Sequence, residues 1–224
     1  SLSVLDFLEL DKKIITKIKE SFKSDVSIKL QFFLWNKDFE HLILFIYNKQ
    51  DPVSFVDFVS KEARTLPENF TICLQNDKKL STLLKSIFLS RYTFDKYKTK
   101  KSEKNAYVYA DEKLTWAIQM EKELIENIIL ARDLGETPSN ELYPESFAKL
   151  VKNTKFKNTK IKILSPKQIE KKWLGLLHAV GKWSIHKPHI VIFERIIDKK
   201  FPTIWIVGKW VTFDTGGIQV KSSD

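Results

Sequence analysis

Residues 206–221 read IVGKWVTFDTGGIQVK, an apolar run that passes into a polar turn with two lysines, an aspartate and a Gly-Gly pair. The run predicts a buried strand over residues 204–207. Its polar continuation places Lys209, Asp214 and Lys221 beyond the carboxyl end of that strand, where open α/β sheets bind their ligands. From the residues alone, this turn is either a functional site or a surface ion pair beside a glycine-rich bend.

The residues before this turn predict further helices and strands. Proline favours the first position of a helix, so one helix is expected from Pro144 and another directly after Ser165 and Pro166. Near-continuous apolar runs are typical of strands covered on both faces. Such strands are predicted over residues 190–193 and 204–207, and a further strand is predicted over residues 160–164.

The N-terminal half also alternates between stretches typical of strands and stretches typical of helices. Stretches rich in β-branched and aromatic residues predict strands at 26–35, 42–47 and 70–74, and apolar residues at three- and four-residue spacing predict a helix over 79–91. The lysine-rich segment 96–105 reads as a surface loop. Alternating strands and helices indicate an α/β fold.

A long helix is predicted between the two halves, over residues 111–134. Asp111 is a suitable N-cap, and the helix is expected to stop at Gly135, before two prolines. A helix of this length can link two domains. The apolar stripe expected along it consists of Trp116, Ile118, Leu124, Ile128 and Leu130.

The composition is typical of a soluble globular protein. The 224 residues are 43% hydrophobic and 29% charged, and the longest apolar runs are far short of the roughly 20 residues that cross a bilayer. No secretory leader is recognised, and the lack of an initiator methionine suggests that further residues precede Ser1. A single cysteine, Cys73, cannot form an internal disulfide, which favours the cytoplasm.

The net charge of +10 raises the question of a nucleic-acid partner, because basic surfaces release counterions from phosphate backbones. The lysines are scattered, however, with modest clusters only at 96–104 and 152–162. We interpret them as solvated surface residues.

Three segments resemble the leucyl aminopeptidase (cytosol aminopeptidase) family. Residues 207–221 match its motif VGKGxTFDxGGxxxK at every specified position except Trp210. Upstream, ARDLGETPSNELYP at 131–144 is similar to ARxLxNTPxNxLxP, and LHAVGKWS at 177–184 is similar to LLAVGxGS. The resemblance covers about residues 111–224, whereas the first half matches only in its α/β character.

The resemblance implies an α/β protein with a smaller, macro-like N-terminal α/β domain at 1–110, a linking helix at 111–135 and the first part of a catalytic metallopeptidase domain at 136–224. It implies a cytoplasmic, two-metal-dependent aminopeptidase that removes N-terminal residues, with a leucine-like preference, from peptide substrates. Homo-hexamers are usual in the family. The alternative is a non-catalytic relative that binds nucleic acid through its basic N-terminal domain.

The resemblance also assigns the site residues. Lys209 and Asp214 are expected to bind two divalent ions, Mn²⁺ or Zn²⁺, and Lys221 is expected to be the catalytic lysine that polarises the scissile carbonyl. A lysine binds a metal only as a neutral amine, and since the reference pKa of lysine is about 10.4, nearby dications must displace its proton. A lysine that stays charged stabilises a developing oxyanion.

The chain departs from the family pattern in its ligand set. The family takes further carboxylate ligands from an Asp soon after the catalytic lysine and from an NTDAEGR-like motif, and neither occurs in these 224 residues. Two ions would be incompletely liganded by Lys209 and Asp214. We therefore expect this chain to be an inactive portion of a longer parent.

Three tryptophans, Trp173, Trp183 and Trp210, stand where the family pattern has glycine. The chain has six Trp and six Gly, whereas average usage of about 7% predicts about sixteen glycines. One hypothesis is that UGA codons for glycine were translated as tryptophan. The alternatives are an ordinary divergent sequence and a decayed pseudoenzyme.

The remaining reactive residue types form no recognisable site. The four histidines lack a metal-binding spacing and read as structural or surface residues, and Cys73 reads as a small apolar residue of a strand. The histidines are His41, His178, His186 and His189.

Overall fold

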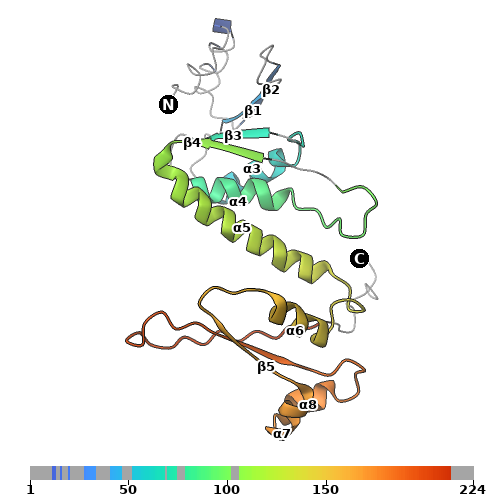
Figure 1. The fold of residues 1–224 in the computed structure, drawn as a ribbon. Coiled ribbons are helices and arrows are strands. Elements are labelled where there is room, and N and C mark those ends of the chain that lie inside the picture. The colour runs from blue at the N-terminus through green and yellow to red at the C-terminus, as the bar shows by residue number, and fades with distance from the viewer. Residues whose placement is uncertain are drawn as a thin grey trace. The chain divides into compact units, whose positions relative to one another are not determined.

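The computed structural model describes residues 12, 13, 16, 20, 28–33, 41–46, 52–68, 70–74, 79–101 and 106–212. The chain divides into two compact units, Ser1–Asp133 and Leu134–Asp224. Both units combine helices and strands, which confirms the predicted α/β class (Figure 1). The domain limits predicted at 110 and 135 stay predictions.

The strands that the structure describes in the first unit form two separate pairs. Strands β1 (Ile28–Phe33) and β2 (His41–Ile46) are antiparallel, and β3 (Phe70–Leu74) and β4 (Ala106–Ala110) are parallel. Parallel neighbours require a crossover, which helix α4 (Leu80–Ser90) provides between β3 and β4. This arrangement is a βαβ unit.

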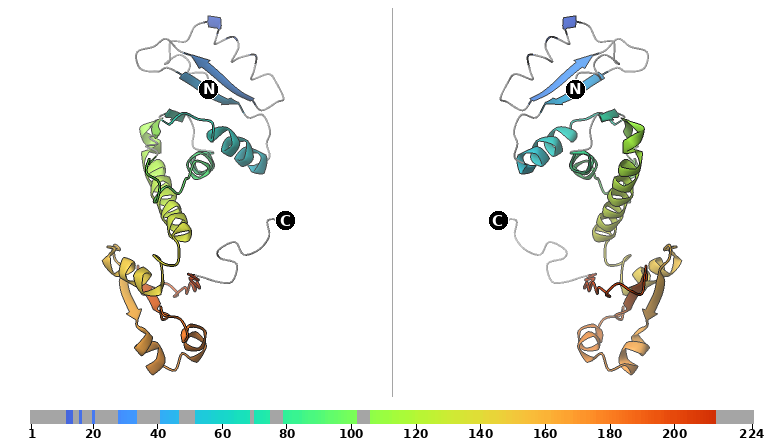
Figure 2. Two further views of the ribbon diagram at one scale, coloured as in Figure 1. Left: turned by 90° about the vertical axis from the view of Figure 1, so that its right-hand side faces the viewer. Right: turned by 90° about the vertical axis from the view of Figure 1, so that its left-hand side faces the viewer.

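Three helices form the core of the first unit together with β3. Helices α3 (Pro52–Ala63), α4 and α5 (Thr115–Glu136) lie on the same side of the β3–β4 pair (Figures 1 and 2). Val59 is fully buried, and Leu84 and Ile87 are each 2% exposed. The cluster also contains Phe55, Ala63, Ile72, Leu80 and Ile125.

Arg91, the residue after α4, binds the end of α3. Its Nη1 donates to the carbonyl oxygens of Ala63 (2.9 Å) and Leu66 (2.8 Å), and its Nη2 donates to that of Pro67 (2.8 Å). The Ala63 carbonyl, at the end of α3, also accepts the Leu66 N–H (3.1 Å), whereas Leu66 and Pro67 lie in the turn beyond the helix. The guanidinium therefore joins the end of α3 and the following turn to the end of α4. Burial lowers the pKa of Arg91, while the charge of Glu68 raises it.

The start of α5 agrees with the prediction, whereas its buried face agrees with the predicted stripe at Ile118 and differs from it at Trp116, Leu124 and Leu130. Asp111 Oδ1 accepts a hydrogen bond from the backbone N–H of Lys113 (3.0 Å), which caps a 3₁₀ turn, η1 (Glu112–Leu114), ahead of α5. Of the predicted stripe, Trp116 is 75% exposed, and Leu124 and Leu130 are 43% and 50% exposed. The residues that pack against the core are Leu114, Ala117, Ile118, Ile125 and Ile129.

A charged residue on the buried face explains the incorrect stripe. Glu121 lies one helical turn from both Ala117 and Ile125. It therefore interrupts the regular spacing of apolar residues from which the buried face of a helix is predicted. Its Oε2 lies 3.4 Å from Lys85 Nζ of α4. The ion pair allows the carboxylate to lie at the α4–α5 contact, because a partly buried charge needs a partner.

The described part of the second unit, up to residue 212, contains one strand pair and the helices α6, α7 and α8. Helix α6 (Pro144–Asn153) begins at the predicted proline and is followed by β5 (Lys160–Leu164), α7 (Pro166–Lys171), α8 (Gly175–Gly181) and β6 (Ile190–Glu194). Ser165 caps α7, and its N–H donates to Gln168 Oε1 at 2.9 Å. The buried residues here are Leu142, Ala148, Val151, Leu164 and Ile169.

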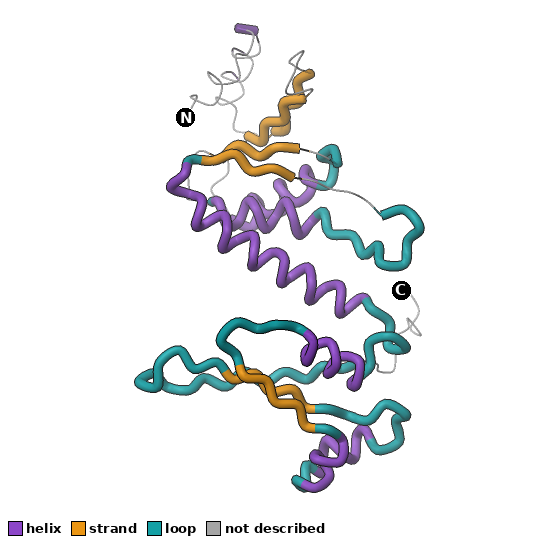
Figure 3. Tube along the Cα trace, viewed as in Figure 1, coloured by secondary structure: helices purple, strands orange, loops and turns teal. Residues whose placement is uncertain are grey.

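Two strand predictions in the second unit need correction. Strand β6 forms, but it is antiparallel to β5 and not covered on both faces, since Phe193 is 47% exposed. The predicted strand at 204–207 is wrong: residues 202–211 have no regular structure (teal in Figure 3), and Ile206 is 94% exposed. A strand requires a neighbour for its backbone groups, and among the described residues this run has none.

Candidate functional site

Lys209 lies in the long irregular segment that follows β6. Its side chain is exposed, as are those of its neighbours Val207 (90%) and Trp210 (45%). A Cβ built on Gly208 would meet nothing within 4 Å. The amine of Lys209 is therefore accessible to an ion or a substrate from solvent.

Trp210 holds this segment against α6. Its ring stacks on that of Phe147, with centroids 4.6 Å apart and an angle of 17° between the planes. The indole of Trp210 thus packs on α6. Sequence reasoning missed Phe147, because a half-buried helix residue carries no signal of the loop that covers it.

The other predicted site residues lie outside the described residues. These are Asp214, Lys221 and the glycines Gly216 and Gly217. Of the predicted constellation, the structure thus places Lys209 alone. The convergence of Lys209, Asp214 and Lys221 on one pocket stays a prediction.

The two upstream segments of the resemblance each run from the end of a helix, α5 or α8, into a turn. Between α5 and α6, the N–H groups of Glu141 and Leu142 donate to the Pro138 carbonyl at 3.0 and 2.8 Å, and Leu142 is only 8% exposed. In the second segment, Gly181 ends α8 beside Pro188. These turns fix the path of the chain on either side of β5.

Gly181 is a position where the space excludes any side chain. An ideal Cβ there would lie 2.5 Å from Pro188 Cδ and 2.7 Å from Cγ. Because the proline ring is rigid, we expect Gly181→Ala to lower the free energy of unfolding by about 1–3 kcal/mol. Gly175→Ala in the same helix is the control, since nothing lies within 4 Å of its Cβ. Urea unfolding compares the two, and an equal loss at both positions would contradict this explanation.

The histidines of the second unit lie among other polar groups. The ring of His186 stacks on Tyr143 with centroids 3.8 Å apart, and His189 Nδ1 lies 3.1 Å from the Lys187 carbonyl oxygen. In the parts of the chain that the structure describes, no three His, Cys, Asp or Glu side chains are grouped to hold a metal. The side chains of His41 and Cys73 lie outside the described set.

An exposed ion pair lies on α6 near these histidines. Lys149 Nζ is 2.9 Å from Glu145 Oε1. The hydrogen bond from Lys149, followed by its charge, lowers the pKa of Glu145, and the same contact raises the pKa of Lys149. Because both groups are solvent-exposed, the pair adds little to stability.

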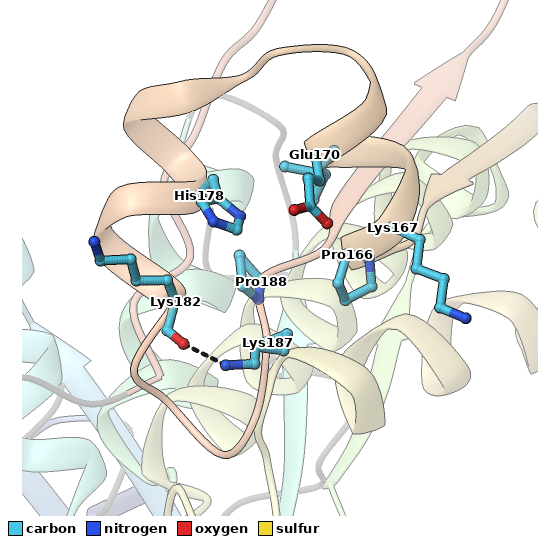
Figure 4. A pocket seen from close by; sticks show the side chains of 8 residues that line it. Pro166, Lys167, Glu170, His178, Lys182, Lys187 and Pro188 are labelled. Atoms are coloured by element: carbon cyan, nitrogen blue, oxygen red, sulfur yellow. Dashed lines mark hydrogen bonds between the residues drawn. The ribbon is translucent and has the colours of Figure 1, made fainter.

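A small pocket opens between α7 and α8. Glu170 of α7 and His178 of α8 point into it, and Lys187 Nζ donates to the Lys182 carbonyl at its edge (Figure 4). Lys209, the predicted site residue that the structure describes, does not line this pocket. Its lining also includes Pro166, Lys167, Ile169 and Pro188.

No helix among the described residues is both long and apolar enough to cross a membrane.

The C-terminal part of this chain is similar to cytosol aminopeptidases. Residues 129–224 match the model of the cytosol aminopeptidase family, catalytic domain. A "Probable cytosol aminopeptidase" of Wolbachia pipientis is 40% identical over 147 residues, covering 61% of this chain and 29% of the relative. One of Shewanella oneidensis is 36% identical over 146 residues, covering 64% and 29%. The chain thus spans less than a third of the length of these relatives.

Solved structures show the same fold. The cytosol aminopeptidase of Coxiella burnetii gives a TM-score of 0.57 at 17% identity, covering 84% of this chain and 41% of that one. The bottromycin maturation enzyme BotP in complex with Mn gives 0.59 at 16% identity, covering 82% and 42%. At these identities the likeness concerns the fold alone.

Proposed function

We propose that a chain carrying these 224 residues together with the remaining ligands is a two-metal aminopeptidase, because residues 129–224 match the catalytic-domain model of the cytosol aminopeptidase family. Its substrates are peptides with a free N-terminus and a leucine-like first residue. The observation that carries the proposal is the motif at 207–221, which lies within the matched residues and contains all three proposed site residues.

The donor chemistry of this motif fits divalent ions. The described ligand, Lys209, is exposed in an irregular segment with open space at Gly208. An amine and a carboxylate suit Zn²⁺ and Mn²⁺, which accept nitrogen and oxygen ligands. The solved neighbour with Mn supports manganese as one candidate. Two ligands do not complete two sites, so further carboxylates are required from the rest of the chain.

In the proposed mechanism, each residue has a separate role. Lys209 as a neutral amine and Asp214 as a carboxylate would hold the ions. The ions would supply a nucleophilic water of lowered pKa at neutral pH. Lys221 remains protonated and donates to the scissile carbonyl oxygen, which becomes negative as the tetrahedral intermediate forms. Glycine at positions 216 and 217 would permit a tight backbone turn beside the ligands.

The assembly and location follow from the same resemblance. We propose a homo-hexamer in the cytoplasm. Sedimentation of the full-length protein tests the assembly, and a monomer at micromolar concentration would contradict it.

Hydrolysis of a leucyl amide by the full-length protein tests the proposed activity. We expect cleavage in the presence of Mn²⁺ or Zn²⁺, loss of cleavage after chelation and recovery when the metal is restored. An N-acetylated leucyl amide is the matched control, because it lacks the free α-amine. No cleavage under any metal condition, or equal cleavage of the acetylated compound, would exclude the proposal.

A further inference from the structure

Helix α7 ends in a turn whose hydrogen bonds define a Schellman motif. The N–H of Trp173 donates to the Glu170 carbonyl (2.9 Å), and the N–H of Leu174 donates to the Ile169 carbonyl (3.3 Å). With Lys172 as the C-cap, these are the two bonds expected from the first and second residues beyond the helix. Trp173 therefore occupies the position at which such turns usually have glycine.

The backbone of Trp173 has the conformation that this position demands. Its φ is 57°, in the left-handed region. There the Cβ of an L-residue approaches the following carbonyl oxygen, so glycine is favoured and a bulky side chain is a clear exception. Asn158 is the other residue with a side chain and positive φ within the described ranges, and asparagine tolerates this region well.

Burial of the indole does not offset this strain, because Trp173 is 92% exposed. The turn is instead fixed by its surroundings: Ile169 is fully buried on one side, and α8 begins at Gly175 on the other. The helices thus require a left-handed residue at 173 irrespective of its side chain.

We infer that residue 173 is glycine in the protein made by its source cell, encoded by UGA and read there as glycine, whereas the printed sequence reads the codon as tryptophan. UGA differs from the glycine codon GGA by one base. The inference explains the strained tryptophan and also accords with the low count of glycine, six in 224 residues. It does not depend on the proposed peptidase activity.

Of the three tryptophans that stand at glycine positions of the family pattern, Trp173 alone has a left-handed backbone. Trp183 and Trp210 do not have positive φ. Both rings also make contacts, Trp183 with Lys182 Nζ at 5.2 Å from its centroid and Trp210 with Phe147. Glycine at these two positions rests on the family motif alone.

The codon and the mass of the native protein test the inference directly. We expect a UGA codon at position 173 and, in protein isolated from the source cell, a tryptic peptide beginning after Lys172 with the mass for glycine at its first residue. A UGG codon, or a native peptide with the mass for tryptophan, would overturn the inference.

Stability measurements test the conformational argument separately. Trp173→Gly should raise the folded-to-unfolded ratio about three- to tenfold, because relief of the left-handed strain exceeds the extra freedom of unfolded glycine. Trp173→Ala removes the same ring but keeps a Cβ, so it should give no such gain. Trp116→Gly, at a 75% exposed position inside α5, should lower the ratio. An equal gain for Trp173→Ala, or no gain for Trp173→Gly, would contradict the argument.

Discussion

Lys209→Met in the full-length protein is expected to lower kcat/KM for a leucyl amide by about a thousandfold or more. Methionine keeps most of the length of the side chain but removes the nitrogen that we propose as a metal ligand. Activation by metal ions contributes several kcal/mol to such reactions, and each 1.4 kcal/mol or so corresponds to a factor of ten. The loss should be accompanied by weaker metal binding, measured by calorimetric titration with Mn²⁺.

The matched control for this substitution is Lys200→Met. Lys200 is exposed in the same irregular segment, and the hydrogen bond to Asp198 Oδ1 comes from its backbone N–H, so the substitution leaves that bond in place. Its kcat/KM should stay within about twofold of the parent protein, as is usual for surface substitutions. If Lys209→Met retained metal affinity and a similar rate, Lys209 would not be a ligand.

Arg91→Met is expected to lower the free energy of unfolding by about 2–3 kcal/mol. The substitution leaves the carbonyls of Ala63, Leu66 and Pro67 without the guanidinium that joins α3 to α4. Hydrogen bonds to charged groups contribute about 1.5–3 kcal/mol each, and partial access to water reduces their sum. Unfolding in urea measures the loss.

Two further variants separate the geometry of Arg91 from its charge. Arg91→Lys keeps a cation but not the planar fork that reaches several carbonyls, so it should recover only part of the stability. Arg64→Met replaces an exposed arginine just beyond the end of α3 and should change stability by less than about 0.5 kcal/mol. A loss at Arg64 as large as that at Arg91 would contradict the capping role.

Helix ends were predictable from the sequence because the residues that set them act locally. Asp111, Pro144 and Ser165 each lie at the predicted start of a helical segment, where a side-chain cap or a fixed φ determines the backbone. By contrast, Glu121 concealed the buried face of α5, since its pairing with Lys85 joins residues on two different helices. A contact of this kind cannot be found from periodicity alone.

The strand expected at 204–207 shows a second limit of pattern reading. Apolar composition indicates that a segment can be buried, but a strand forms only where another strand supplies hydrogen bonds. For the candidate site, the sequence motif identified the residue types and spacing, and the structure adds the exposure of Lys209 and the Trp210–Phe147 stack. The left-handed backbone at Trp173 was not predictable from periodicity, although its neighbours end a helix.

Anomalous diffraction from crystals of the full-length protein grown with Mn²⁺ tests the metal-binding role of Lys209 and Asp214 most directly. We predict an anomalous peak at bonding distance from both Lys209 Nζ and the Asp214 carboxylate, with Lys221 beside it but not bound to the ion. A peak that contacts neither side chain, or a map in which Lys209 and Asp214 point to separate surfaces, would contradict the proposed metal centre.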